Sequence, residues 1–519
     1  MIKFIPRLTR GAGAAAALLL SLGVSARAAT TPVTLHELLV AALNTNLELR
    51  AKRLDPEAQK YRLDAAWGEF DPAFVGGSYV LSGERPQNYR DFLATGSTIS
   101  IYQEEVIHYE AGFTGKLPTG TTYTLNSFAE RSDNSINRKA PVFNGDLMNP
   151  SVTGPGFHPE YTTNAVFSLT QPLLRDFGFA ANLAEVRLNK SALVSARYEL
   201  QGTLLRILAN VVGAYYEMVF GQENVRVKEE AVTLAQNLVH ENQRRVDEGK
   251  MSPLDVTQAQ SRLAEAQEEL LLAQNFLAQR RNTLRELTRE NFDAAEDDWS
   301  VDGSYLRREA PEVKRDALLP VMFEHNPAYL ANVEAARAGD IRLAYAKNQR
   351  WPRVDLKASV SYNGLAGEWS AAYTNFDQRT GPDWNVGLVV NIPLTGRAGK
   401  ARLAEAKSRK LQALIAIKRS EVALLSAFDN AMRDLASSRE RMKLVRDSVA
   451  LAEAAHNAEE KRLASGLTTS YNVATAQRDL SQARSRELAT LVDLNKAYAQ
   501  LYALLGTLPE QMQIDVKAE

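Results

Sequence analysis

The chain contains no cysteine. This absence excludes disulfide bonds, thiolate metal sites, a cysteine nucleophile and a lipid anchor on an N-terminal cysteine. An excess of charge of one sign is missing too, because 61 basic and 62 acidic side chains leave a net charge of -1. Nucleic-acid-binding proteins usually carry a basic patch or stripe, so we expect no nucleic acid among the partners.

Catalytic patterns are equally scarce. The six histidines are scattered and form neither an HExxH motif nor a metal-ligand cluster. No activated nucleophile and no paired acid and base stand out. We therefore expect a protein that is not an enzyme and that holds no cofactor and no metal. The histidines are His36, His108, His158, His240, His325 and His456.

The first 28 residues have the layout of a secretory signal peptide. Three basic residues precede the apolar run 12–24, and Ala26-Arg27-Ala28 is a small-x-small cleavage site. A membrane anchor is the alternative, but the run is shorter than the roughly 20 apolar residues that a bilayer core requires. No later segment reads as a membrane-spanning helix. We expect an exported protein that, if it lies in a membrane, spans it with strands.

The remaining chain is an internal repeat. Adding 217 to the apolar positions of one long helical segment gives those of another, at a constant spacing of seven residues. We expect a first repeat over 29–310, a second over 311–508 and a tail over 509–519. The matched pairs are Val211 with Phe428, Met218 with Leu435, Val225 with Met442, Val232 with Val449, Val239 with His456 and Val246 with Leu463.

Each repeat predicts short helices, strands, a long helix, a turn and a returning helix. The long helices, 183–248 and 403–465, would each extend for about 100 Å. Their sevenfold spacing predicts the left-handed packing of coiled coils. The returning helices are about half as long, so two short helices stacked end to end would complete a wall of constant height. An ordinary coiled-coil dimer would leave the strands unexplained.

Strict alternation marks the strands. Apolar and polar residues alternate strictly over 354–363, and a returning run with Trp384 at one end places Val386, Leu388, Val390 and Ile392 on one face. Each run is about ten residues, the length of a tilted outer-membrane strand. A soluble sheet with one buried face alternates in the same way, but the signal peptide and the flanking helices favour a membrane. Because exposed sheet edges are not tolerated in lipid, several copies must share one barrel.

The first repeat holds more strand signals than the second. Besides strands over 73–81 and 163–173, the segment 109–131 reads as two strands around Pro118-Thr119-Gly120. These two form either an extra membrane hairpin, which we favour slightly, or a hairpin in an outer loop. The segment 132–159 is rich in Asn, Pro and Gly and is expected to be an exposed loop.

The turns after the long helices carry matching signals. Gly249 and Gly466 are expected to be left-handed helix caps. Ser252 and Pro253 are typical of a helix start, and Thr469 with Ser470 offers similar capping chemistry.

The chain resembles the TolC-like outer membrane efflux proteins from about Leu35 to Leu508. The resemblance rests on the strand ends 168–173 and 390–394, on the doubled turns 245–260 and 462–477, and on the closing 503–506. It implies an α+β membrane protein: a homotrimer in which an outer-membrane β-barrel continues into a long periplasmic α-helical coiled-coil barrel.

In function, the resemblance implies a passive exit duct in the outer membrane, projecting into the periplasm, of a tripartite efflux or type I secretion system. The partners would be outer-membrane lipid, a periplasmic adaptor (membrane fusion) protein and an inner-membrane RND, ABC or MFS pump. The cargo is not indicated. The alternatives are a periplasmic adaptor, which would have one hairpin between small β domains, and a structural coiled-coil protein of the envelope.

The resemblance also implies that the helix tips form the periplasmic gate and dock the adaptor. Asp255 stands where the family often has an acidic residue for closure, whereas Leu463 replaces a tyrosine and Thr468 an arginine. The acidic rings of the family fall at Asn472 and Thr475, so either other charges gate this chain or its mouth is less cation-selective. The candidate residues are Arg245, Asp247, Glu248, Gly249, Ser252, Pro253, Asp255, Lys461, Arg462, Gly466, Thr468, Thr469, Asn472 and Thr475.

Overall fold

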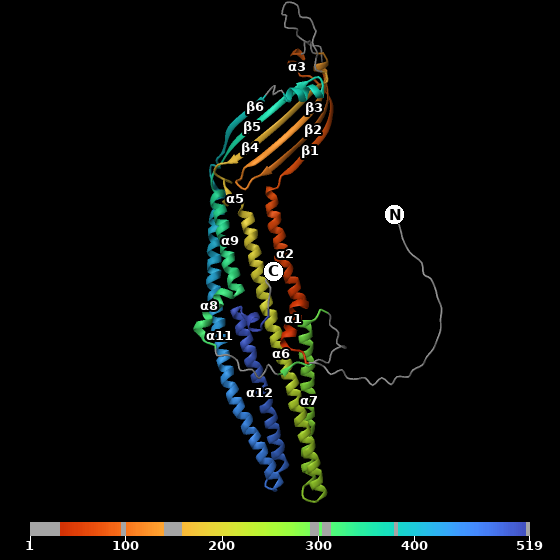
Figure 1. Ribbon diagram of the computed structural model, residues 1–519, viewed down its shortest axis with the longest axis vertical. Helices are drawn as coiled ribbons and strands as arrows, with labels where there is room; N and C mark the ends of the chain where they lie inside the picture. The colour runs from red at the N-terminus through yellow and green to blue at the C-terminus, as the bar shows by residue number, and fades with distance from the viewer. Residues whose placement is uncertain are drawn as a thin grey trace, which may run out of the picture.

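The computed structural model describes residues 32–94, 100–139, 158–290, 300–303, 313–377 and 382–514. The molecule is elongated, with one sheet at one end and long helices that run from it to the other end (Figure 1). This is the α+β architecture expected from the sequence. The signal peptide predicted for residues 1–28 lies outside the described residues.

The helices confirm the internal repeat. The long helices α6 and α11 have 64 and 68 residues, and the returning helices α7 and α12 both have 36. The first repeat contains α1 (Leu35–Thr45), α2 (Leu47–Trp67), α6 (Ala184–Asp247) and α7 (Pro253–Thr288). The second contains α8 (Arg315–His325), α9 (Pro327–Gln349), α11 (Arg397–Ala464) and α12 (Ser470–Leu505). Short elements are η1 (Gly68–Phe70), α3 (Tyr89–Ala94), α4 (Ser135–Lys139), α5 (Phe179–Asn182), α10 (Trp369–Asp377) and α13 (Leu508–Gln511).

Two asparagines stack the short helices on the returning ones. The Asn46 Oδ1 atom caps α2 by accepting from the backbone N–H of Leu49 at 3.0 Å, and its Nδ2 group donates to the carbonyl of Leu287 in α7 at 3.0 Å. Asn326 does the same for α9, and its Nδ2 group donates to the carbonyl of Leu504 in α12 at 2.9 Å. The short helices therefore continue the line of the returning helices, as the sequence predicts.

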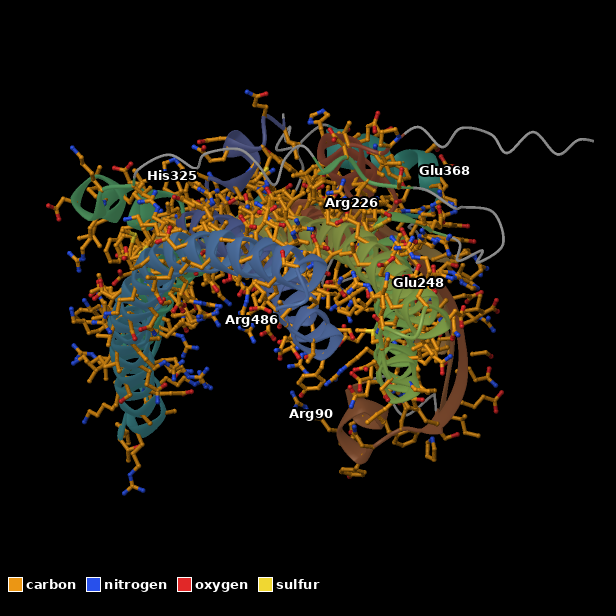
Figure 2. The ribbon with its side chains drawn as sticks, turned by 90° about the horizontal axis from the view of Figure 1, so that it is seen from below. Arg90, Arg226, Glu248, His325, Glu368 and Arg486 are labelled. Atoms are coloured by element: carbon orange, nitrogen blue, oxygen red, sulfur yellow. The ribbon has the colours of Figure 1, made fainter. Side chains whose placement is uncertain are left out.

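The helices form one curved wall. Along its lower half, α6 packs between α7 and α12, and α11 packs against α12; in the upper half, α6 lies between α2 and α9. Seen from below, the wall is an arc with Arg486 on its concave side and His325 on its convex side (Figure 2). The sevenfold positions fill the wall: Val211, Met218 and Phe428 have no exposed surface.

The main core lies at mid-height, where α1, α6, α7 and α12 meet. The tail expected from residue 509 onward begins in this core, because Ile514 is buried there together with Leu508, the last residue of the second repeat.

One expectation about membrane helices is wrong. By length and composition, α6 is apolar enough to cross a bilayer, with a mean hydropathy of 1.2 over its best window. However, 67% of that window is buried inside the protein, so the apolar residues of α6 serve the core of the wall.

The sheet has six antiparallel strands in chain order. They are β1 (Ala73–Pro86), β2 (Ile101–Lys116), β3 (Thr122–Asn134), β4 (Glu160–Pro172), β5 (Arg353–Ala366) and β6 (Pro382–Asn391). The sequence allowed the segment 109–131 to be either a hairpin of the main sheet or a hairpin in an outer loop. It forms the hairpin β2–β3, which is part of this sheet. The predicted loop 132–159 begins with the end of β3 and with α4, and residues 140–157 lie outside the described part.

The two faces of the sheet differ in polarity. The register aligns one large apolar side chain from every strand in a single row: Phe74, Phe113, Leu125, Phe167, Val360 and Trp384. All six are exposed, from 37% for Val360 to 77% for Trp384. We call this side the apolar face. The opposite, polar face carries His108, Glu110 and Glu130, and the Nδ1 atom of His108 lies 2.9 Å from the Glu130 carboxylate.

Glu217 ties three helices together above the tips. From α6, its carboxylate accepts hydrogen bonds from Arg280 of α7 at 2.7 Å and from Lys496 of α12 at 2.6 Å. Burial by itself would raise the pKa of Glu217, but these two hydrogen bonds outweigh it and hold the pKa below its ordinary value.

A carboxyl group whose pKa is lowered by folding stabilises the protein above its unfolded pKa, near 4.5, and this stabilisation disappears as the pH falls through the folded pKa. We therefore expect Glu217→Gln to lower the free energy of unfolding by about 1.5–3 kcal/mol at neutral pH and to flatten its decline in acid. Urea unfolding followed by circular dichroism across this pH range measures both. Glu440→Gln, at an exposed position of α11, is the control; an unchanged acid slope in Glu217→Gln contradicts the prediction.

Candidate functional site at the helix tips

The two helical hairpins end side by side at the pole opposite the sheet (Figure 1). One tip is the turn 248–252 between α6 and α7, and the other is the turn 465–469 between α11 and α12. Glu248 marks the first tip in the view from below (Figure 2). The structure thus brings all the predicted gate residues to one end of the molecule.

Both long helices end in the predicted left-handed cap. The φ angles are +71° at Gly249 and +72° at Gly466. At the first tip, the N–H group of Gly249 donates to the carbonyl of Val246 and that of Lys250 to the carbonyl of Arg245, both at 2.8 Å. The equivalent hydrogen bonds at Gly466 and the residue after it are 3.1 and 2.9 Å long. The same hydrogen bonds therefore close both turns.

The helix starts after the turns differ. Ser252 accepts from the N–H of Leu254 at 3.3 Å, its own N–H donates to Asp255 at 3.2 Å, and Pro253 occupies the first turn of α7. This is a capping box. Thr469 makes no side-chain capping bond, so the expectation that it caps α12 is wrong. Thr468 instead accepts from the Nδ2 group of Asn472 at 3.0 Å.

Most charged candidates form bonds within their own hairpin. Asp247 accepts from Gln243 at 2.9 Å, Glu248 pairs with Lys250 at 2.8 Å, and Arg462 pairs with Glu459 at 2.6 Å. The Lys250 ammonium group holds the pKa of Glu248 below its ordinary value.

The remaining polar candidates are local as well. The Asp255 carboxylate belongs to the cap of its own helix. The carbonyl of Lys461 accepts from the N–H of Ser465 at 3.2 Å, and the Thr475 hydroxyl donates to the carbonyl of Tyr471 at 2.9 Å.

Arg245 is the predicted residue that crosses between the hairpins. Its Nε group donates to Glu241 at 2.9 Å, which lowers the pKa of Glu241, and its guanidinium also donates to the carbonyl of Leu463 in α11 at 3.3 Å. Leu463 is buried in a small cluster that we call the apolar clasp. The clasp consists of Leu238, Leu463, Val473 and Ala474, with Met251 against them.

Further contacts between the hairpins were missed by sequence reasoning. The guanidinium of Arg262 in α7 lies 5.6 Å from the ring centroid of Tyr471 in α12, a cation–π contact. Higher up, Lys228 of α6 bonds both Glu269 of α7 at 2.9 Å and Ser481 of α12 at 3.2 Å. Periodicity identifies such residues only as polar positions, because it does not give the relative position of two hairpins.

The tips also contain buried polar atoms without hydrogen-bond partners among the described residues. Asn242 and Ser470 are buried, and among the described residues the Asn242 Oδ1 and Ser470 Oγ atoms have no hydrogen-bond partner. A buried polar atom without a partner costs about 1–3 kcal/mol. The contact between the hairpins at the tips is therefore held less firmly than the charged contacts above it.

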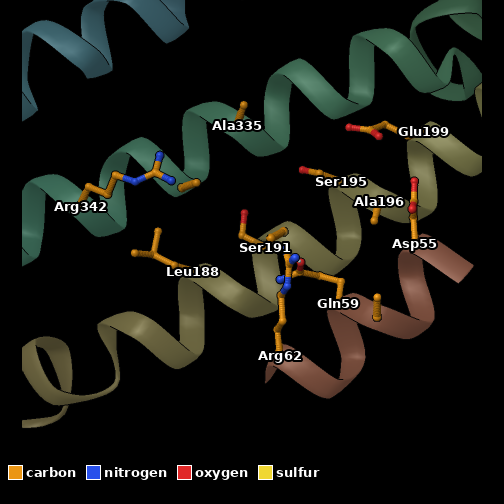
Figure 3. Close-up of a pocket in the computed structure, with 13 residues that line it drawn as sticks. Asp55, Gln59, Arg62, Leu188, Ser191, Ser195, Ala196, Glu199, Ala335 and Arg342 are labelled. Carbon is orange, nitrogen blue, oxygen red and sulfur yellow. Dashed lines mark hydrogen bonds between the residues drawn. The ribbon is translucent and has the colours of Figure 1, made fainter. Parts of the chain in front are cut away.

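A cavity of about 410 Å³ lies in the upper wall between α2, α6 and α9 (Figure 3). Its two carboxylates are already paired, since Lys52 bonds both Asp55 at 2.9 Å and Glu199 at 2.8 Å. The remaining lining is largely Ala and Ser, which lets the three helices approach one another. We assign this cavity to helix packing.

The unequal caps predict unequal stability of the two tips. Ser252→Ala removes a capping bond and is expected to cost the start of α7 about 1 kcal/mol, whereas Thr469→Ala removes none. Amide hydrogen exchange measured by mass spectrometry on peptides from the starts of α7 and α12 tests this. We expect faster exchange near Leu254 in Ser252→Ala and little change near Asn472 in Thr469→Ala. Equal acceleration at both tips would show that the caps are equivalent.

Comparison with known proteins agrees with this geometry. Residues 128–288 and 327–507 match the family of outer membrane efflux proteins. The chain is 24% identical to the outer membrane protein TolC of Vibrio cholerae serotype O1 over 323 residues, which are 61% of this chain and 70% of that protein. Its fold is similar to that of the outer-membrane channel OprN, with a TM-score of 0.63 and 18% sequence identity. The match covers 91% of this chain and 90% of the OprN chain. For CusC the TM-score is 0.65, at 14% identity and 92% and 93% coverage.

These matches cover both repeats and confirm the resemblance seen in the sequence. They also place the protein in the outer membrane. The chain belongs to the outer membrane efflux protein family.

Proposed function

We propose that three copies of this chain form one passive exit duct, to which a periplasmic adaptor and an inner-membrane RND, ABC or MFS pump deliver cargo for efflux or type I secretion. The observation that carries the proposal is a sheet with one apolar face and two open edges, joined to an arc of helices. Neither part is complete in a single copy.

The sheet edges require partners. The strand order begins at β1 and ends at β6, so within the described chain the outer edges of these two strands have no neighbour. Unpaired backbone groups are not tolerated in the hydrocarbon core, so β1 of one copy pairs with β6 of the next. Three copies supply eighteen strands, a number at which barrels leave an aqueous channel. The polar face would line that channel.

The tips close the other end of the duct. At the tips, the contacts that join the hairpins within one copy are the apolar clasp, the bond from Arg245 to Leu463 and the contact of Arg262 with Tyr471. Separation of the two hairpins breaks these contacts without unfolding either hairpin. In this proposal Asp255 acts by fixing the start of α7, and the exposed Asp247, Glu248, Lys461 and Arg462 offer charges to the adaptor.

The architecture speaks against the two alternatives. A periplasmic adaptor would present one hairpin between small β domains, and a coiled-coil envelope protein would need no sheet. The described chain has two hairpins and a six-stranded sheet whose apolar face suits lipid.

Native mass spectrometry of the detergent-purified protein tests the assembly. We expect three copies per particle and, after reconstitution into planar bilayers, a conducting pore. Polyethylene glycols of increasing size are then added on the side of the loops that connect the strands. The largest polymer that still enters the pore and reduces the current gives the barrel width, and we expect the width of an eighteen-stranded barrel. A monomer, or a trimer that never conducts, would rule the duct out.

Arg262 and Tyr471 test the gate. We expect Arg262→Ala and Tyr471→Ala to raise the probability of opening by about two- to fivefold per copy, the range of a cation–π contact of about 0.5–1 kcal/mol. Tyr471→Phe retains the ring and should remain near the parent protein. Tyr61→Ala, at an exposed position of α2, is the control. Single-channel recording measures the effect, and closure unchanged in both alanine variants would place the gate elsewhere.

A further inference from the structure

A short helix lies on the apolar face of the sheet. The helix α10 connects β5 to β6 at the end of the sheet remote from the long helices (Figure 1). It packs against β4 and β5. Thr163 and Gly364, which contact it, are paired in register two residues beyond Ala165 and Tyr362. Since side chains alternate between the faces, all four lie on the apolar face.

The packing of α10 on the strands is tight. The Thr163 hydroxyl donates to the carbonyl of Ala372 at 3.2 Å, and the Trp369 ring meets the Tyr161 ring edge to face, with 4.7 Å between centroids. Ala372 has no exposed surface. A Cβ atom on Gly364 would lie 2.1 Å from the Ala372 carbonyl oxygen, so only glycine permits this approach.

The outward side of α10 is polar and aromatic. Ser370, Tyr373 and Thr374 are exposed, Tyr373 by 51%. The strand surface on the same face below the helix is apolar, as Val354, Leu356, Ala358 and Val360 of β5 show. Along this face, the exposed side chains therefore change from purely apolar ones on the strands to ones that can form hydrogen bonds on α10.

The apolar strip below α10 has the height of an outer-membrane core. The eight residue steps from Val354 to Tyr362 extend for about 26 Å along the strand. The usual tilt reduces this to about 20 Å, close to the apolar band of about 25 Å in outer-membrane barrels. The helix thus lies just beyond the level of the acyl chains.

We propose that α10 lies in the headgroup layer of the outer leaflet and contacts polar lipid headgroups through Ser370, Tyr373 and Thr374. Tyrosine is typical of membrane interfaces because its ring is apolar and its hydroxyl is polar. The segment WSAAYTNFD contains no Lys or Arg. Its contacts are therefore hydrogen bonds and ring packing rather than ion pairs with phosphate. This inference depends on the outer-membrane location and not on the trimer or the gate.

Depth-dependent fluorescence quenching tests the position. Because the chain has no cysteine, single cysteines at Tyr373, Val386 and Glu440 take a fluorescent label specifically. The full chain is reconstituted into phosphatidylcholine vesicles that carry a nitroxide either on the headgroup or deep in the acyl chain. Val386 lies on the apolar face and Glu440 on the distant part of α11, so they report the hydrocarbon core and water.

We expect the label in Tyr373→Cys to be quenched more by the headgroup nitroxide, the label in Val386→Cys more by the deep nitroxide, and the label in Glu440→Cys by neither. A Tyr373→Cys label that is quenched by neither would mean that α10 stands above the membrane or is covered by protein. A Tyr373→Cys label quenched mainly by the deep nitroxide would place α10 in the hydrocarbon. Either result overturns the proposal.

Two glycine variants test whether the sheet holds the helix at this depth. Gly364→Ala forces α10 off the strands, whereas a Cβ on Gly387 of β6 meets nothing within 4 Å. In the Tyr373→Cys background we expect Gly364→Ala to lose the preference for the headgroup nitroxide and Gly387→Ala to keep it. The deep quenching of a Val386→Cys label in Gly364→Ala verifies that the sheet is still inserted. If the sheet is inserted and the quenching of the Tyr373→Cys label is unchanged in Gly364→Ala, the packing of α10 on the strands does not set the depth of the helix.

Discussion

The joint at mid-height, made by Asn46 and Asn326, is the interaction on which the rest of the wall depends. Each asparagine uses its amide oxygen to start one helix and its amide nitrogen to bind a carbonyl near the end of another. The returning helices have 36 residues, whereas the long helices have 64 and 68, so the returning helices cover only the lower half of the wall. Other helices must pack beside α6 and α11 in the upper half. The asparagine joint places α1–α2 and α8–α9 there and makes the wall continuous up to the sheet.

Polar contacts between the hairpins weaken from this joint toward the tips. From one hairpin to the other, the Lys496 ammonium group of α12 donates to the Glu217 carboxylate of α6, and lower down Lys228 of α6 donates to the neutral hydroxyl of Ser481 in α12. At the tips, Arg245 donates to a backbone carbonyl beside the apolar clasp, and Arg262 contacts the Tyr471 ring. Local opening requires the least free energy where such contacts are weakest, so in the proposed duct we expect movement in the lowest turns.

Features that recur with a fixed period were predictable from the sequence. The sevenfold positions from Val211 to Leu463 gave the helices, the alternation over 354–363 gave the strands, and Gly249 and Gly466 gave the turns. Features that depend on the meeting of distant segments were not predictable. The hairpin β2–β3 had the right alternation, but only pairing with β1 and β4 places it in the sheet. The contact of Arg262 with Tyr471 and the docking of α10 on Gly364 require the assembled wall. Thr469 has the right residue type for a cap, but its side chain makes no capping bond.

The duplication that built this chain left two ends that are no longer alike. The first tip has a complete capping box at Ser252 and Asp255, and the second has none at Thr469. In the proposed duct, the mouth would then consist of six tips of two alternating kinds and would have threefold rather than sixfold symmetry. A protein that seats on this rim would find two different grooves in turn, one within each copy and one between copies. Its own six binding elements would then have to alternate in shape, or half of them would have to bind less tightly.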